Sequence, residues 1–170
     1  MLVIKRRFSE NTFILEYGVN MITVRDFRNE DFEAINKLWI EYGLSSFERN
    51  DSLEVIKKTI SNGGFFLVME KTDLGIIIGS SWVTNDARRL YLHHFFIKQE
   101  FRQKGYGKQL LSESIKKAKE IGLQIKLEVH DNNKNTQMLY KGADFKYLGD
   151  FRTYIRRDIK KNIISLRLND

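Results

Sequence analysis

The sequence predicts an α/β fold, in which about four helices flank a mixed, mostly antiparallel central sheet of about six to seven strands. Apolar runs of strand length, joined by polar or glycine-containing turns, lie between residues 65 and 97 and favour antiparallel hairpins. Longer stretches with apolar residues at helical spacing lie before and after these runs. The 170 residues suffice for one domain with a full hydrophobic core.

The first expected elements are a strand at residues 21–25 and two helices. The first helix begins near Asn29, a favourable N-cap residue that acidic residues follow in the first turn. The second begins at Asp51 and ends at Gly63, because glycine commonly closes a helix. The first helix is expected to bury four apolar side chains: Phe32, Ile35, Leu38 and Trp39.

Two hairpins and a second group of helices follow. Apolar runs at 65–70 and 75–83 form the first hairpin, and a turn at Asn85 leads into a strand at 90–97. A helix from Tyr106 to Ile121 presents one apolar face and ends at a glycine. The remaining expected elements are a strand at 125–129, a short helix at 134–142, and a last pair of strands at 145–148 and 152–157.

We expect a single domain at residues 21–158, with residues 1–20 as an N-terminal extension and residues 159–170 as a C-terminal tail. The absence of cysteine excludes disulfides and thiol chemistry, and a cytoplasmic location is the expectation that fits it. No apolar run approaches the roughly 18 residues of a membrane span. Polar residues interrupt the N-terminal stretch before it reaches the apolar length of a signal peptide.

The charge pattern argues against nucleic acid as a partner. A net charge of +7 would suit a nucleic-acid binder, but most lysines alternate with acidic residues, as on the solvated face of a helix. Three histidines without cysteine, none at metal-ligand spacing on one helix, predict no metal site.

The turn before the helix at Tyr106 has the composition of a phosphate-binding loop. Gly105 and Gly107 let the backbone approach a diphosphate, and the first helical amides direct free N–H groups toward it. A nucleoside triphosphate loop requires a hydroxyl residue where this chain has Gln109, and a dinucleotide fingerprint requires a third glycine near Leu110. Neither pattern fits, so the turn is expected to hold another phosphorylated cofactor.

Two motifs resemble those of the GNAT N-acetyltransferase superfamily, and the resemblance spans roughly residues 22–157. Arg102-Gln-Lys-Gly105-Tyr-Gly107 is similar to the acetyl-CoA signature Arg/Gln-x-x-Gly-x-Gly/Ala. Asn133-Lys-Asn-Thr136-Gln-Met-Leu139-Tyr140-Lys-Gly-Ala-Asp144-Phe145 is similar to Asn-x-x-Ala-x-x-Leu-Tyr-x-x-x-Gly-Phe, with Thr136 and Asp144 as departures. Because Asp144 replaces a glycine, we expect the turn after this helix to be closed differently.

The resemblance implies an N-acetyltransferase that moves the acetyl group of acetyl-CoA directly to a primary amine, on a small molecule or a protein, in a ternary complex. It implies a backbone N–H near Phe95, Phe96 or Ile97 as the oxyanion donor, and Tyr140 as the general acid. The other implied cofactor contacts are Arg102, Gln103, Lys104, Gly105, Tyr106, Gly107, Lys108 and Asn133. A non-catalytic acyl-CoA-binding sensor or interaction module is the alternative, and a homodimer is an expectation taken from the superfamily.

The general base stays open among Glu128, His93 and water. An ammonium has a pKa near 10.4, so the attacking amine must first lose a proton. Glu128 stands where the branch that acetylates protein N-termini has its base. His93 shares a face with Tyr91 and Phe95 by strand alternation, and one of the pair His93-His94 must then face the other side.

The acceptor should be recognised by the more variable segments of the chain. Acidic residues there would attract a cationic amine, and three aromatic side chains are expected to contact an apolar part of the acceptor: Trp39, Phe47 and Trp82. The sequence does not distinguish an aminoglycoside, a polyamine, an amino acid or a protein N-terminus.

Overall fold

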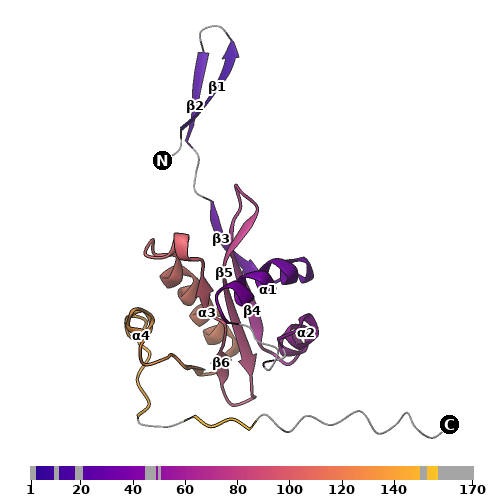
Figure 1. The fold of residues 1–170 in the computed structure, drawn as a ribbon, viewed down its shortest axis with the longest axis vertical. Helices are drawn as coiled ribbons and strands as arrows, with labels where there is room; N and C mark the ends of the chain where they lie inside the picture. The colour runs from indigo at the N-terminus through magenta and orange to yellow at the C-terminus, as the bar shows by residue number, and fades with distance from the viewer. Residues whose placement is uncertain are drawn as a thin grey trace, which may run out of the picture.

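The computed structural model describes residues 3–9, 12–17, 21–44, 49, 51–149 and 153–156, without the side chains of the first two ranges. Its body is a six-stranded sheet between two pairs of helices (Figure 1). The strands are β3 (Ile22–Asp26), β4 (Phe65–Lys71), β5 (Ile76–Asn85), β6 (Leu90–Leu92), β7 (Phe96–Ile97) and β8 (Ile125–Leu127). The helices are α1 (Phe32–Glu41), α2 (Leu53–Ser61), α3 (Tyr106–Ile121) and α4 (Lys134–Lys141).

The strand order is β3-β4-β5-β6-β8, and β7 pairs with β5 in the line of β6. Every pairing is antiparallel except that of β6 with β8, which runs parallel through the crossover helix α3. The mixed, mostly antiparallel sheet and the four helices are therefore confirmed. β1 (Val3–Ser9) and β2 (Thr12–Tyr17) form a separate hairpin, within the part of the chain expected to be an extension.

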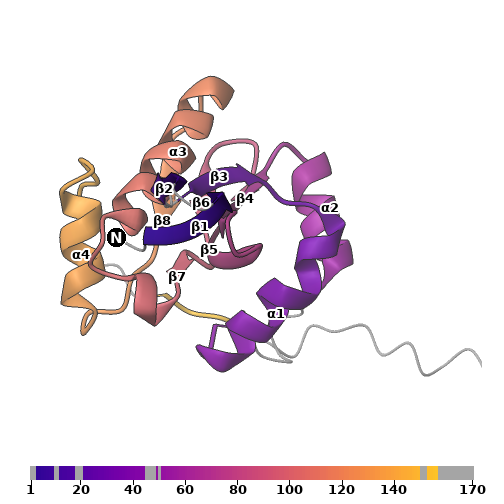
Figure 2. The same cartoon turned by 90° about the horizontal axis from the view of Figure 1, so that it is seen from above.

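Helices cover both faces of the sheet, with α1 and α2 on one side and α3 and α4 on the other (Figure 2). Alternation along β4 divides its side chains between two cores. Phe65, Leu67 and Met69 join the core under α3, whereas Phe66 and Val68 join the core under α1 and α2. Because all five are buried, β4 reads as a continuous apolar run rather than an alternating one.

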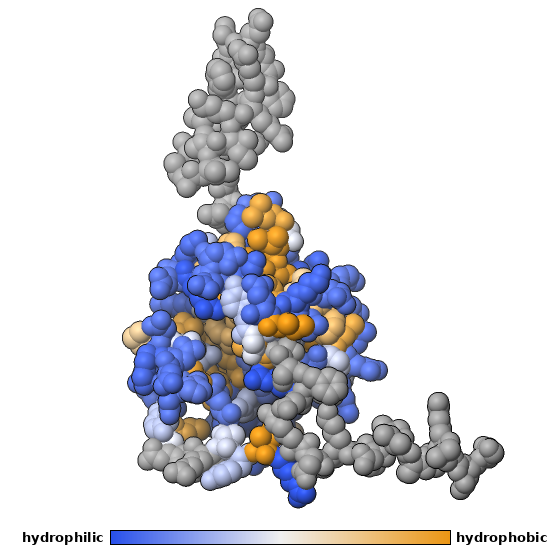
Figure 3. Space-filling model, in the orientation of Figure 1, coloured by the Kyte–Doolittle hydropathy of each residue, from blue (hydrophilic) through white to orange (hydrophobic). Residues whose placement is uncertain are grey.

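Apolar side chains also gather on the surface over the β4–β5 turn (Figure 3). Leu74 in this turn and Met21 before β3 remain 60% and 52% exposed, and the Met21 carbonyl accepts from the Thr72 amide. In the described part of the chain, no helix has the length and apolarity needed to cross a membrane.

Both expected helix starts are shifted by tertiary pairing of acidic side chains. Asn29 is not an N-cap: it opens a 3-10 turn, Asn29–Asp31, ahead of α1. The turn is held by Asp31, whose carboxylate accepts from the Arg28 amide at 2.7 Å and from both terminal nitrogens of Arg25. Of the four side chains expected to be buried by α1, Ile35 and Trp39 are fully buried, and Phe32 and Leu38 only partly.

The N-cap of α2 is Ser52 rather than Asp51. The Ser52 hydroxyl accepts from the Val55 amide at 3.3 Å. Asp51 instead pairs with His94, with 3.0 Å between its carboxylate and the imidazole. The expected helix start thus fails because tertiary pairing takes the carboxylate away from the helix terminus.

The expected final pair of strands is absent from residues 145–149 and 153–156, and the residues between and beyond them lie outside the described residues. Phe145 packs its ring on Tyr140, with 5.6 Å between centroids, instead of joining a ladder. Leu148, Tyr154 and Ile155 are correspondingly exposed.

The turn after α4 shows why Asp144 can replace glycine. The Phe145 amide donates to the Tyr140 carbonyl at 3.1 Å, and the Asp144 amide donates to the Lys141 carbonyl at 3.2 Å. These are the paired bonds of a Schellman motif, and the Tyr140–Phe145 ring contact is its usual apolar partner. Asp144 has a φ of 64°, the left-handed conformation glycine would adopt, so the expectation of a different closure is wrong.

Asp144→Gly should therefore stabilise the fold. An L-residue in the left-handed region carries strain that glycine lacks, partly offset by the greater freedom of glycine in the unfolded chain. We expect a gain of about 0.5–1 kcal/mol in the free energy of unfolding, measured by urea titration. Asp144→Ala retains the Cβ and should give no gain. Equal stability of the Gly and Ala variants would contradict the assigned strain.

Candidate active site

An extra residue interrupts the strand opposite β5, so the strand expected at 90–97 is divided into β6 and β7. Val83 opposes Leu92 and Ser80 opposes Phe96. The four residue steps from Leu92 to Phe96 therefore lie opposite only three steps along β5. The His93 amide still donates to the Trp82 carbonyl at 2.7 Å. The irregularity is therefore a β-bulge at residues 93–95, a device that changes the direction of side chains locally.

The bulge places both histidines on the face covered by α1 and α2. The rings of His93 and His94 lie 5.8 and 5.3 Å from the ring of Trp82, which belongs to that face. Phe95 then turns to the opposite face, where its ring lies 6.1 Å from Tyr140. The expectation that the two histidines face opposite sides of the sheet is wrong. The expectation that His93 and Phe95 share a face is also wrong, because strand alternation fails at the extra residue.

Backbone donors after the bulge point away from β5. The Lys98 amide donates to the Ile78 carbonyl, so by alternation the Phe96 amide also faces β5 while the Ile97 amide faces away. The described residues supply no acceptor for the Phe95 amide. Gly79 allows this close strand approach, since a Cβ there would lie 2.8 Å from the Phe96 carbonyl oxygen.

Tyr140 lies beside these backbone groups. Its side chain is only 6% exposed and packs between Phe95 and Phe145, and its hydroxyl has no hydrogen-bond partner among the described residues. Burial raises the pKa of Tyr140 above its ordinary value, so the phenol stays protonated at neutral pH. The arrangement offers an O–H donor next to the bulge.

The glycine loop begins directly after β7 and a 3-10 turn, Gln99–Phe101. Gly105 precedes α3 with a φ of 84°, and Gln103 also has a positive φ of 60°. A side chain at Gly105 would meet no neighbouring atom, so its requirement is conformational. Gly107 packs against α4, where a Cβ would lie 3.6 Å from Leu139. The loop therefore joins the bulge to the two helices on the Tyr140 side of the sheet.

The polar side chains around this loop contact the protein itself. Arg102 Nε donates to the Ile97 carbonyl and Lys104 Nζ donates to the Glu100 carbonyl, both at 2.8 Å. Asn133 caps α4 by accepting from the Thr136 amide at 3.2 Å. Arg102 and Asn133 thus shape the loop and the helix that carries Tyr140.

A groove of about 760 Å³ lies between α3 and α4 and includes Lys108, which directly follows the loop in the sequence. Lys108, Lys116 and Lys119 line it together with the apolar side chains of Met138 and Leu139. Glu120 and Asp144 also lie on its wall. The groove therefore combines cationic and apolar surface, as a ligand with phosphates and an apolar portion requires.

A polar cluster lies on the other face of the sheet, at the β6–β8 end. It consists of Tyr91, His93, Lys126 and Glu128. The rings of Tyr91 and His93 lie 4.4 Å apart, Lys126 Nζ lies 5.3 Å from the Tyr91 ring, and the Lys126–Glu128 ion pair spans 3.5 Å. The Glu128 side chain is 47% exposed. The two candidate bases are thus brought into one cluster that solvent reaches.

Burial dominates the titration of this polar cluster. Burial, assisted by the neighbouring His94, lowers the pKa of His93 to about 4, against the opposite effects of Asp51 and Glu128. Burial and the Glu128 carboxylate raise the pKa of Tyr91. His93 Nε2 lies 2.8 Å from the Thr84 hydroxyl. At neutral pH the imidazole is therefore neutral and hydrogen-bonded.

Of the three aromatic residues expected to contact the acceptor, Trp39 and Trp82 are core residues. They are 0% and 4% exposed, lie 5.7 Å apart as stacked rings, and present no free face to a ligand. Phe47 lies outside the described residues. The expected contact fails for the two tryptophans because α1 covers this face of the sheet.

The buried pair of Asp51 and His94 is the feature that sequence reasoning missed. Both side chains are less than 10% exposed, and His94 Nδ1 and Trp82 Nε1 are buried without a partner among the described residues. The pair ties the start of α2 to the bulge, 43 positions along the chain. The sequence marks Asp51 as an acidic residue at the start of α2, but only the fold identifies His94 as its partner.

Comparisons with known proteins agree on one family. A model of the acetyltransferase (GNAT) family matches residues 24–145. An acetyltransferase of Pectobacterium atrosepticum is 27% identical over 124 residues, which cover 72% of this chain and 86% of that protein.

Two solved structures resemble the fold. YncA of Salmonella typhimurium, a putative acetyltransferase solved with its cofactor acetyl-CoA, aligns with a TM-score of 0.65 at 19% identity, over 76% of this chain and 82% of that chain. AAC(6′)-Iy, solved with the bisubstrate analogue CoA-S-monomethyl-acetylneamine, aligns with a TM-score of 0.65 at 15% identity. The alignment covers 81% of this chain and 99% of that chain. At these identities the two structures support the fold alone.

The depressed pKa of His93 predicts a loss of stability in mild acid. Between about pH 6.5 and pH 4 the unfolded histidine binds a proton that the folded one does not, so the free energy of unfolding falls as pH falls. We expect the free energy of unfolding to fall by on the order of 1–2 kcal/mol. This is less than the full linkage value because solvent reaches part of the ring.

Urea unfolding at pH 7 and pH 4.5 measures this loss, with His93→Gln as the comparison. The variant should lose less stability than the wild type over this interval. Identical losses would show that His93 is not the group responsible.

Proposed function

This chain belongs to the acetyltransferase (GNAT) family and is an acyltransferase, and from this premise we propose that it moves the acetyl group of acetyl-CoA directly to a primary amine in a ternary complex. Acetyl-CoA would lie on the α3–α4 face, with its phosphates at the glycine loop, and the amine would approach from the face of the polar cluster. Direct transfer needs no covalent enzyme intermediate, which suits a described site with no cysteine.

The observation that carries this proposal is the position of Tyr140 beside the bulge. A buried phenol, with no hydrogen-bond partner in the described part of the chain, lies against Phe95, next to backbone amides that point away from β5. A thioester between them would find an N–H donor for its carbonyl oxygen and an O–H donor for its sulfur. Such donors are effective because they are held in place before the reaction.

The chemistry follows from these donors. The neutral amine attacks the thioester carbon, and the oxyanion that forms accepts a hydrogen bond from the Phe95 or Ile97 amide, neither of which has an acceptor among the described residues. When the intermediate collapses the C–S bond breaks, and Tyr140 gives its proton to the departing thiolate. The proton lost by the amine passes to a base, and the phenolate regains a proton from solvent.

We assign the base role to Glu128, acting directly or through one water. Its carboxylate is exposed at the polar cluster, where it attracts an ammonium group, and the Lys126 ion pair orients it. His93 is the weaker candidate, because burial depresses its pKa to about 4 and its Nε2 is held by the Thr84 hydroxyl. His93 would instead shape the wall on which the amine rests.

Tyr140→Phe tests the acid. The ring volume is kept and the described residues offer the hydroxyl no partner, so the variant should unfold at the wild-type temperature. It should still be stabilised by acetyl-CoA, by about 2.7 kcal/mol at 100 times the dissociation constant. Its kcat should fall roughly 100-fold. Tyr154→Phe, at an exposed tyrosine, is the matched control and should keep full activity.

Thiol release with a panel of amines measures these rates. A Tyr140→Phe variant with wild-type kcat would remove Tyr140 from the acid role. Binding of acetyl-CoA by the wild type without turnover on any amine would favour the non-catalytic acyl-CoA-binding sensor instead.

Glu128→Gln tests the base through the dependence of rate on pH. Without the carboxylate, kcat/KM at pH 7 should fall about 10-fold or more, and the loss should shrink at high pH, where more of the amine is already neutral. Glu33→Gln, an exposed position on α1, is the control. An unchanged pH–rate profile in Glu128→Gln would move the base to His93 or to solvent.

A further inference from the structure

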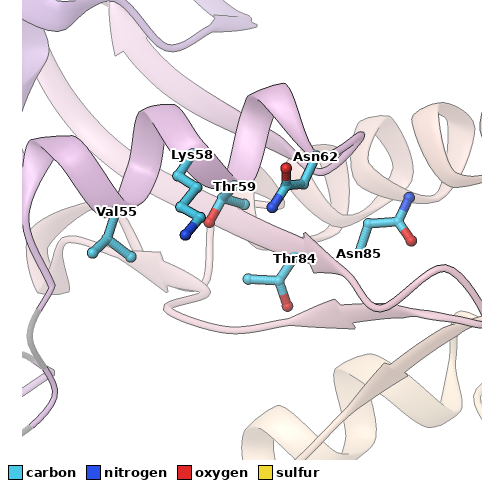
Figure 4. A pocket seen from close by; sticks show the side chains of 6 residues that line it. All are labelled: Val55, Lys58, Thr59, Asn62, Thr84 and Asn85. Carbon is cyan, nitrogen blue, oxygen red and sulfur yellow. The ribbon is translucent and has the colours of Figure 1, made fainter. Parts of the chain in front are cut away.

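A second cavity opens between α2 and the end of β5, on the same face of the sheet as the polar cluster. Its volume is about 220 Å³, enough for a small functional group rather than a whole cofactor. The lining side chains are Val55, Lys58, Thr59 and Asn62 from α2, and Thr84 and Asn85 from β5 (Figure 4).

The lining has the chemistry of an anion site. Lys58 is its single charged side chain, no carboxylate lines it, and Lys58 forms no ion pair with the described residues. The hydroxyl of Thr59 and the amide of Asn62 supply further donors. A carboxylate suits this set, because a charge-assisted hydrogen bond from lysine combines with neutral donors around it.

Thr84 connects this cavity to the candidate active site. Its side chain lines the cavity, and its hydroxyl lies 2.8 Å from His93 Nε2. Thr84 pairs with Tyr91 across the hairpin, and Tyr91 pairs with Lys126 on β8, two residues before Glu128. The polar cluster therefore lies directly beside a molecule held in the cavity.

The strand geometry sets the length of such a molecule. Phe95 follows Tyr91 by four residues, about 13 Å along an extended strand and less across a bulge. A ligand with its anion at Lys58 and its amine near the bulge thus spans roughly 10 Å, the reach of about three extended residues.

We propose that this cavity binds the carboxylate of the acceptor, and that the acceptor is a short peptide or a similarly long amino acid derivative with a free amine at its other end. The inference rests on the proposed function and specifies its substrate class. Lys58 acts in recognition and takes no part in the transfer itself.

Triglycine and triglycinamide test the proposal, since they share amine and length and differ in the terminal carboxylate. Triglycine should have a kcat/KM at least about 10-fold higher, mostly through a lower KM. Lys58→Met should remove this preference and leave the KM for acetyl-CoA unchanged. Lys57→Met, at the neighbouring exposed lysine that does not line the cavity, should retain it.

Equal rates for the two peptides, or an unaltered preference in Lys58→Met, would overturn the carboxylate site. Turnover of amines without a carboxylate, with neither peptide accepted, would overturn it while leaving the acetyltransferase proposal intact. If acetyl-CoA neither stabilises the protein nor reacts with any amine, the proposed function itself fails, and this inference fails with it.

Discussion

The extra residue between Leu92 and Phe96 is the constraint on which the candidate site depends. A regular strand would send His93 and Phe95 to the same face and would direct every second amide to β5. With the bulge, both histidines turn toward α1 and α2, while Phe95 turns toward Tyr140. The interruption also frees backbone donors next to that phenol. Two buried polar atoms on the adjoining rings, Trp82 Nε1 and His94 Nδ1, lack partners among the described residues.

The sheet separates two chemical environments. On the α3–α4 face a buried phenol, a glycine loop and a lysine-lined groove surround apolar packing. On the α1–α2 face, charged and titratable groups lie at the open β6–β8 end, beside a core of stacked aromatic rings. The Asp51–His94 pair joins that core to the bulge. A reaction across the sheet would therefore take its two substrates from opposite faces.

The elements were largely predictable because each has a local cause. The helix from Tyr106 to Ile121 has its expected bounds, since Gly105 and Gly122 take positive φ values at its two ends. Asn133 caps the following helix. The predictions that failed depended on tertiary contacts. Asp51 pairs with His94 instead of capping its helix, and Trp39 and Trp82 are buried where α1 packs on the sheet. The bulge was invisible to strand alternation because one added residue leaves no trace in an apolar run. Asp144 shows the converse, since a strained residue adopts the glycine conformation when the surrounding hydrogen bonds require it.

Titration of the ¹⁵N-labelled protein with acetyl-CoA, followed through its backbone amide resonances, tests the central claim most directly. If the bulge, the loop and Tyr140 form one cofactor site, the amides of Phe95, Ile97 and Gly105 should shift together and saturate with a single dissociation constant. The amides of Gly43 and Gly75, in turns of the α1 and β4–β5 regions, should stay in place. Saturable shifts that leave Phe95 and Ile97 unmoved would contradict the account, because the cofactor would then bind without reaching the bulge.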